Sequence, residues 1–194
     1  RDPDAVQADD GRNYTVKFVP RNGSPVFAED GAVANMATIS YCDALGRPEQ
    51  VIDVNGSPEG CDMVQPVVYD AFGHDDAITY LPYEASGPAG SYRTDWSGAA
   101  DAFYGTLFYG SSARQAMPRT DRRYEVSGLN RVRSEQGPGD EFRTGGRAKT
   151  YLYDTNAENE LLWFEYDSGV LYKGNYPARR LYKTRVEDED GHVT

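Results

Sequence analysis

Histidine is scarce in this chain of 194 residues, which contains only His74 and His192. Histidine is the commonest general acid or base in enzymes, and neither residue has a plausible nucleophile near it in the sequence. No glycine-rich loop followed by lysine predicts a phosphate site, and among the 31 Asp and Glu residues no pair stands out as acid and base. We therefore expect no catalytic residues, no cofactor and no enzyme activity.

Cysteine is equally rare, with Cys42 and Cys61 alone. Two cysteines and two distant histidines do not provide a spaced set of zinc ligands. The two cysteines flank the loop at residues 53–60, and in an oxidising compartment a disulfide between them would stabilise the chain by about 3 kcal/mol in the chain-entropy model. The alternative is a pair of unrelated buried thiols, and the sequence leaves both open.

Long apolar runs and excess positive charge are also missing. No stretch approaches the roughly 20 apolar residues that span a bilayer, so we expect no membrane span and a soluble chain. The start carries no secretory signal and resembles a mature or trimmed end. The net charge of −11 argues against nucleic acid as a partner, because binding phosphates requires clustered Lys and Arg. The dense basic patches, at residues 119–123 and 179–180, are flanked by acidic or aromatic residues.

Tyrosine is abundant, and three segments place it before an acidic residue, a short spacer and a glycine: residues 41–47, 69–74 and 124–129. The acidic side chain can accept hydrogen bonds from the backbone of a turn, and glycine adopts the positive φ that a reversal needs. Weaker copies occur at residues 153–154 and 166–169. Such recurrence predicts a repeat of β-hairpins. The predicted repeat-turn residues are Tyr41, Asp43, Gly46, Tyr69, Asp70, Gly73, Tyr124, Glu125 and Gly128.

These segments make the chain resemble the Tyr-Asp repeat family (YD-repeat or RHS), in particular the N-terminal-side segment of RHS-type proteins of Bacteroidetes. The matching stretches run in order through residues 39–48, 68–73, 80–83, 91–95, 128–132 and 176–184. Three residues depart from the family pattern: Cys42 interrupts the first Tyr-Asp pair, Glu125 replaces Asp, and His74 stands where Arg or Lys is usual. The self-cleavage motif Asp-Pro-x-Gly of full-length RHS proteins is absent, so that activity is not expected here.

The pattern predicts an all-β fold, in which antiparallel YD-repeat hairpins form a curved or spiralling sheet with one or two short helical insertions. We expect a flexible tail over residues 1–12 and a single β domain over 13–194, with loops at 85–91 and 137–147. The best helix candidate begins near Asp95 or Ser97, either of which can cap it.

Two further kinds of site come from composition. Acidic turns at residues 9–11, 29–31 and 188–191 offer oxygen ligands that suit Ca²⁺, although none forms an EF-hand loop and acidic turns are usually only solvated. Several aromatic side chains could form a sugar-stacking platform, or could belong to the core and to packing between strands. They are Trp96, Tyr104, Tyr109 and residues 151–153.

The resemblance implies a non-catalytic structural segment of a secreted, extracellular RHS protein, as part of the shell wall that encloses a C-terminal toxin in large RHS proteins, or as an N-terminal adaptor. About five hairpins cannot close a large shell, so open strand edges must pair with the remainder of an RHS-type chain or with further copies. The alternative is an extracellular adhesin or filament subunit that assembles by strand-edge pairing, with surface glycans as a further partner.

Overall fold

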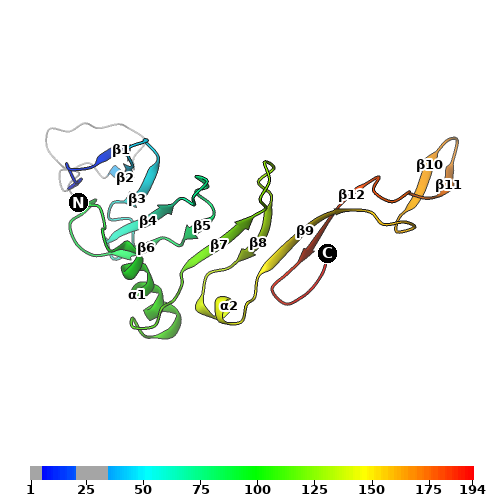
Figure 1. Ribbon diagram of the computed structural model, residues 1–194. Coiled ribbons are helices and arrows are strands. Elements are labelled where there is room, and N and C mark those ends of the chain that lie inside the picture. The colour runs from blue at the N-terminus through cyan, green and yellow to red at the C-terminus, as the bar shows by residue number, and fades with distance from the viewer. Residues whose placement is uncertain (1–5, 21–34) are drawn as a thin grey trace. The chain divides into compact units, whose positions relative to one another are not determined.

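The computed structural model describes residues 6–20 and 35–194, which divide into two compact units (Figure 1). The first unit contains the described residues up to Asp121 together with residues 137–143, and the second contains residues 122–136 and 144–194. Antiparallel strands dominate and two helices are present among the described residues, which confirms the all-β fold class with short helical insertions. The sequence predicts one β domain over residues 13–194, and the structure divides this range into two units. Among the described residues, the buried hydrophobic side chains all belong to the first unit.

The first unit is one antiparallel sheet in which, apart from β6, strands that follow each other along the chain are also neighbours in space. The order is β1-β2-β3-β4-β5-β7, and β6 also pairs with β4. The strands are β1 (Asn13–Pro20), β2 (Asn35–Cys42), β3 (Pro48–Asp53), β4 (Asp62–Val68), β5 (Ile78–Tyr80), β6 (Tyr83–Ala85) and the first half of β7 (Arg119–Tyr124). This connectivity is what a series of hairpins produces.

The core of the first unit is a row of side chains that crosses four strands. The register places Ile39 opposite Ile52 and Ile52 opposite Val64. On the other edge of β4, Val64 lies opposite Tyr83. All four side chains are fully buried. Burying each such side chain contributes about 1.5–3 kcal/mol, so this row is a main source of stability for the unit.

Helix α1 (Trp96–Tyr109) packs on this core through Ala100 and Tyr104. It begins after Asp95, one of the two predicted caps, although the Asp95 side chain makes no capping hydrogen bond. Position 105 inside the helix requires glycine, because a Cβ there would come within 2.5–2.6 Å of backbone carbonyl oxygens in the loop that follows. Neither helix in the described part of the chain is long and apolar enough to cross a membrane.

The segment before β1 is anchored, in contrast to the flexible tail expected over residues 1–12. The backbone N–H of Gln7 donates to the carbonyl oxygen of Ala89 at 2.7 Å, and the N–H of Asp9 donates to the Tyr41 hydroxyl at 2.9 Å. Two apolar side chains of this segment also pack against the core. These contacts hold residues 6–12 on the sheet, and the remainder of the expected tail lies outside the described residues.

The second unit is a sheet with the strand order β7-β8-β9-β12 and a separate two-stranded sheet, β10-β11. The strands are the end of β7, β8 (Val132–Gln136), β9 (Lys149–Thr155), β10 (Leu162–Tyr166), β11 (Val170–Asn175) and β12 (Tyr182–Glu187). Between β8 and β9, the short helix α2 (Asp140–Thr144), most of which belongs to the first unit, occupies part of the loop predicted at residues 137–147.

Asn156 connects the two sheets of the second unit. It follows β9, and its side-chain oxygen accepts hydrogen bonds from the backbone N–H groups of Arg180 and Leu181, which precede β12. Its amide group donates to the carbonyl oxygen of Pro177 at 2.9 Å. Residues 122–136 and 144–194 are all described, and Asn156 is the one buried residue among them. The amide therefore holds together the point where β9 leads into β10 and β11 leads back into β12.

Candidate functional site

The first predicted repeat turn connects β2 to β3 and is a tight hairpin. The N–H of Asp43 donates to the carbonyl oxygen of Arg47 at 2.9 Å, and the N–H of Gly46 donates to the carbonyl oxygen of Asp43 at 3.0 Å. Gly46 adopts a φ of 79°. This is a three-residue loop with a bulge, in which the left-handed position favours glycine.

The Asp43 carboxylate stabilises this turn by accepting hydrogen bonds from its backbone and from the Arg47 side chain. One oxygen accepts the backbone N–H groups of Leu45 and Arg47 at 2.8 and 2.9 Å. The other accepts the Arg47 guanidinium, with Nε at 2.8 Å and Nη2 at 2.7 Å. The hydrogen bond from the Arg47 backbone is the main reason that the pKa of Asp43 lies below its usual value. The carboxylate thus satisfies turn donors that strand pairing leaves free.

The second repeat turn, between β4 and β5, repeats this geometry with histidine in place of arginine. The N–H of Asp70 donates to the carbonyl oxygen of His74 at 3.1 Å, and Gly73 has a φ of 89°. The Asp70 carboxylate accepts the backbone N–H of His74 and lies 2.8 Å from Nδ1 of its ring. The hydrogen bond to the His74 side chain lowers the pKa of Asp70. His74 therefore stabilises this turn through its contacts with Asp70.

The third repeat turn, between β7 and β8, is wider than predicted. The N–H of Glu125 donates to the carbonyl oxygen of Arg131 at 2.9 Å, and the guanidinium donates to both carboxylate oxygens at 2.8 Å. The pair with Arg131, followed by the Ser127 hydroxyl, lowers the pKa of Glu125 to about 2. The expectation for Gly128 is wrong, because Asn130 occupies the left-handed position with a φ of 48°.

A fourth turn of the same kind lies at residues 188–192, where the sequence predicts an acidic turn but not a member of the repeat. The N–H of Asp188 donates to the carbonyl oxygen of His192 at 3.0 Å, and Gly191 has a φ of 85°. The Asp188 carboxylate accepts the backbone N–H of His192 at 2.8 Å and lies 3.1 Å from its ring Nδ1. The spacing Asp-x-x-Gly-His, shared with Asp70, would have assigned this turn to the repeat without the preceding tyrosine.

The two weaker copies of the repeat pattern, at residues 153–154 and 166–169, differ in whether they form a turn. Asp154 lies within β9 opposite Lys183 and is not at a bend. Residues 166–169 do form a hairpin tip, where the N–H of Asp167 donates to the carbonyl oxygen of Gly169 at 3.0 Å.

Two of the turn arginines also contact the tyrosine of the next YD segment. The Arg47 guanidinium lies 4.4 Å from the ring centre of Tyr69, which precedes Asp70. Arg131 lies at the same distance from the ring of Tyr153, which precedes Asp154. Such cation–π contacts contribute about 0.5–1 kcal/mol at exposed sites. Each arginine thus clamps its own turn and connects it to the following segment.

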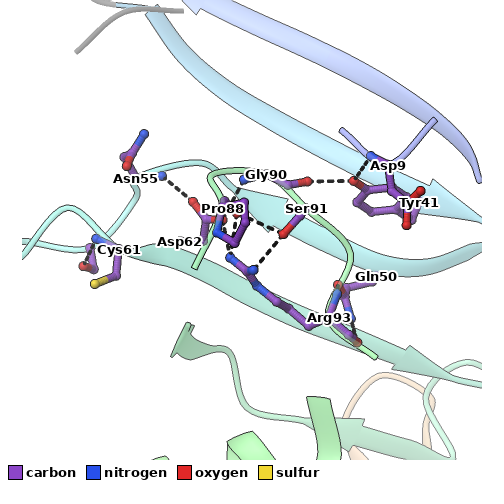
Figure 2. A network of polar contacts seen from close by, with 11 residues as sticks. Asp9, Tyr41, Gln50, Asn55, Cys61, Asp62, Pro88, Gly90, Ser91 and Arg93 are labelled. Carbon is purple, nitrogen blue, oxygen red and sulfur yellow. Dashed lines mark hydrogen bonds and ion pairs between the residues drawn. The ribbon is translucent and has the colours of Figure 1, made fainter. Parts of the chain in front are cut away.

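Tyr41, the first repeat tyrosine, has another role. Its hydroxyl donates to the carbonyl oxygen of Gly90 at 2.7 Å, and burial raises its pKa. Tyr41 thereby joins a polar network that holds the loop after β6 on the sheet (Figure 2). The predicted loop at residues 85–91 is therefore fastened along much of its length.

Asp62 and Arg93 are the centre of this network, which local sequence patterns did not indicate. The Asp62 carboxylate accepts the N–H of Gly90 at 2.7 Å, Nη2 of Arg93 at 2.8 Å and the N–H of Asn55 at 3.0 Å. Its side chain is only 2% exposed. The fully buried amide of Gln50 bonds both the N–H and the carbonyl oxygen of Arg93. A buried carboxylate with several donors holds a loop in one conformation.

The two cysteines are free thiols, so the disulfide considered from the sequence is not formed. Cys42 lies opposite Pro48 at the end of β3 where the first hairpin turns. Cys61 precedes β4 near the other end of β3, where Asp53 faces Met63. One strand of this length separates them by roughly 15–20 Å, whereas a disulfide needs Cα atoms about 4.4–6.8 Å apart.

In two of the acidic turns considered for Ca²⁺, the first aspartate accepts hydrogen bonds from the backbone of its own turn. Asp9 accepts the N–H of Gly11 at 3.0 Å, and Asp188 closes the fourth turn. Residues 29–31 lie outside the described residues. Within the described ranges, no group of three or more His, Cys, Asp or Glu side chains is arranged to hold a metal ion.

The aromatic side chains considered as a sugar platform serve largely in packing. Trp96 meets Tyr80 edge to face, with ring centres 4.9 Å apart. Tyr104 is buried and donates its hydroxyl to the carbonyl oxygen of Pro82. Tyr109 donates to Asp140. These three residues come from α1 in the first unit, whereas residues 151–153 belong to β9 in the second.

A hollow of about 640 Å³ lies between β6 and α1 in the first unit, with Tyr83 and Arg93 in its lining. The Tyr83 hydroxyl and Nε of Arg93 are buried there without a hydrogen-bond partner among the described residues. Burial raises the pKa of Tyr83 to about 12, so its hydroxyl stays protonated near neutral pH. Tyr83 is therefore unsuited to the role of a base.

The comparison with protein families gives one match. A family model described as a domain of unknown function (DUF6443) matches residues 21–155. The match covers more than half of the chain, which therefore belongs to this family. No curated protein and no solved structure matches the chain.

Proposed function

We propose that this member of the DUF6443 family is a non-catalytic β-repeat segment of a secreted YD-repeat (RHS) protein, in which it forms part of the shell wall or an N-terminal adaptor. The observation that carries the proposal is the connection between successive hairpins. Arg47 closes one turn and stacks on Tyr69 of the next YD segment, and Arg131 does the same with Tyr153. Repeat arrays are stabilised by such contacts between neighbouring units.

The sheet edges support the proposed partners, which are the remainder of an RHS-type chain or further copies of this one. On the outer side of β12, Val186 exchanges two backbone hydrogen bonds with Thr194, at 2.9 and 2.8 Å. Glu187 forms a bridge with Val193 beside them. Residues 193–194 of the chain itself thus pair with part of this edge. In the first unit, β1 pairs with β2 alone among the described strands, and an open edge favours further pairing.

The alternative is an extracellular adhesin or filament subunit, and the same open edges favour it. In that case β1 and β12 would pair between copies by β-augmentation. The two functions differ in their dependence on concentration. A wall segment without its neighbouring repeats stays monomeric, whereas a filament subunit forms ordered polymers as its concentration rises. Screening the purified chain on a glycan array tests whether surface glycans are an additional partner.

Blocking the β12 edge provides the test. The N–H of Val186 points away from β9 toward Thr194, so the N–H of Thr184, two residues earlier, points the same way. A Thr184→Pro substitution removes this outward donor while leaving the inward bonds to β9 in place. Thr184→Val is the matched control, because it changes the same side chain and keeps the N–H.

Analytical ultracentrifugation and negative-stain microscopy then measure assembly over a range of concentrations. For a wall segment or adaptor, we expect the wild-type chain and both variants to remain monomeric. Ordered fibres that form with the wild-type chain and Thr184→Val but not with Thr184→Pro would contradict the wall proposal and establish the filament function.

A further inference from the structure

We propose that one face of the β10–β11 hairpin is a docking surface for a polypeptide segment that carries apolar side chains flanked by lysine or arginine. This face, called the arm face below, lies on the hairpin that β9 and β12 lead into (Figure 1). It consists of five side chains: Leu162, Phe164, Tyr166, Val170 and Tyr172.

The strand register places these side chains together. Phe164 lies opposite Tyr172, and Tyr166 lies opposite Val170. Directly opposed residues share one face of a sheet. The register shifts between Trp163 and Phe164, where Lys173 is an extra residue on β11. Because the extra residue lies on β11, β10 keeps its alternation, which adds Leu162 to the face of Phe164 and Tyr166. The rings of Phe164 and Tyr172 are in contact, with centres 5.6 Å apart. The arm face is therefore a continuous apolar stripe.

The stripe is exposed to an unusual degree. Its members range from 52% exposed at Phe164 to 83% at Tyr166. With the areas typical of such side chains, the arm face exposes on the order of 500 Å² of apolar surface, which is at the size where patches on soluble proteins mark binding sites. β10 and β11 also pair only with each other among the described strands, and an isolated two-stranded hairpin is marginally stable in water.

The opposite face of the hairpin is occupied. Lys173 forms an ion pair with Glu165 at 3.3 Å, and the ring of Trp163 stacks on that of Tyr176 with centres 5.5 Å apart. Leu171, which lies opposite Glu165 on this face, is 44% exposed. The two faces thus differ, and a partner would gain most apolar burial on the arm face, where five apolar side chains adjoin one another.

The charge near the arm face and the area of that face indicate which kind of partner binds there. Residues 156–176 contain four carboxylates and one lysine, on a chain whose net charge is −11. Glu165 pairs with Lys173 on the opposite face and Glu160 pairs with Lys183, so Glu158 and Asp167 are the two carboxylates of this segment without an ion pair among the described residues. A second copy would bring the same charge, and roughly 500 Å² per partner is below the approximately 800 Å² of a standard stable interface. An anionic membrane surface would also repel these carboxylates. A segment with apolar residues between Lys or Arg complements both the stripe and the charge around it.

Hydrogen exchange of the full chain tests the proposal with defined probes. One synthetic peptide alternates leucine with lysine, and a second peptide of the same length alternates leucine with glutamate. We expect the lysine peptide to slow amide exchange in residues 162–166 and 170–175, because docking and strand addition protect these backbone groups. The glutamate peptide, with the same apolar content, should leave exchange unchanged.

Substitutions on the hairpin locate the binding. The double variant Phe164→Ser with Tyr172→Ser removes two exposed rings. It should raise the dissociation constant of the lysine peptide about tenfold or more, because aromatic residues dominate interface energies. Tyr182→Ser is the matched control, because Tyr182 is 97% exposed and lies on β12 outside the arm face. Unchanged exchange in β9, which belongs to the same unit as the hairpin, verifies that this unit of the variants stays folded.

Each contrary result overturns the proposal. Absence of protection by the lysine peptide, equal protection by the glutamate peptide, or an equal loss with Tyr182→Ser would remove the arm face as a site for basic segments. Protection that rises with protein concentration alone would identify a second copy as the occupant. Binding to vesicles of phosphatidylcholine and phosphatidylglycerol would identify a membrane. These results are separate from the edge test at Thr184, which concerns assembly.

Discussion

In the first unit, a row of fully buried side chains crosses four strands and is covered by α1. In the second unit, all of which is described, only Asn156 is buried, and the sheet is stabilised by backbone pairing, exposed ion pairs and ring contacts. Exposed ion pairs typically contribute about 0–1 kcal/mol, far less than buried side chains. The first unit thus has the means to fold on its own contacts, and the second depends more on what pairs with it.

Tryptophan fluorescence allows this comparison to be measured. The chain contains two tryptophans, Trp96 in the first unit and Trp163 in the second. A Trp163→Phe background therefore reports on the first unit alone and a Trp96→Phe background on the second. We expect the second unit to lose its signal at a lower urea concentration.

The largest effect is expected from Asp62→Ala in the first unit. Removing this buried carboxylate leaves the charge of Arg93 unpaired at a site where its side chain is only 13% exposed, which costs about 3–5 kcal/mol. Glu165→Ala removes the exposed ion pair with Lys173 in the second unit and should cost about 0–1 kcal/mol. Urea unfolding measures both, and equal losses would show that burial does not distinguish the units.

A smaller effect is expected from Asn156→Ala in the second unit. The substitution leaves the N–H groups of Arg180 and Leu181 without their acceptor, at a cost of about 1–3 kcal/mol. Hydrogen exchange should speed up in β10–β11 and in the adjoining ends of β9 and β12, while β2–β4 stay protected. Acceleration throughout the chain would mean that the two units unfold as one.

The turns predict a third difference, between two glycines of the repeat pattern. Gly46 has a φ of 79° and Gly128 does not lie in the left-handed region, and neither position has an atom that a Cβ would meet. Gly46→Ala should therefore cost about 1–2 kcal/mol from backbone strain alone, and Gly128→Ala close to nothing. Thermal unfolding of both variants checks this, and an equal loss would refute the assignment of Asn130 to the left-handed position.

The smallest effect is expected from acid at the third turn. The pKa of Glu125 is lowered from 4.5 to about 2 by Arg131, so this pair adds stability above the unfolded pKa and loses it as the pH falls from about 4.5 to about 2. Carbon NMR of the carboxyl group should follow this titration. Arg131→Met should return the pKa of Glu125 toward its usual value, and an unchanged pKa would contradict the role of the ion pair.

The repeat turns show how far local sequence reaches. Asp43 and Asp70 could be placed at turns because aspartate, spacer and glycine act within five residues, where the backbone hydrogen bonds are local. The same pattern misled at Gly128, since the loop there is longer and Asn130 takes the left-handed position. The acidic turn predicted at residues 188–191 was not assigned to the repeat, because no tyrosine precedes Asp188, although it shares the Asp-x-x-Gly-His spacing of Asp70.

The loop network shows where such reasoning ends. Arg93 meets Asp62 across 31 positions and Gln50 across 43, and no local pattern indicates which strands bring them together. The same holds for the free cysteines, whose separation depends on the length and pairing of β3.

Composition and short-range spacing were sufficient to establish that this chain is a series of antiparallel hairpins, because turn chemistry acts between residues a few positions apart. The division into a packed unit and an exposed one, the anchored start of the chain and the uncovered stripe on β10–β11 depend on strand register and on side chains that meet from distant positions. Those contacts arise only when the strands of each unit have paired, so they depend on the tertiary structure and not on short-range spacing.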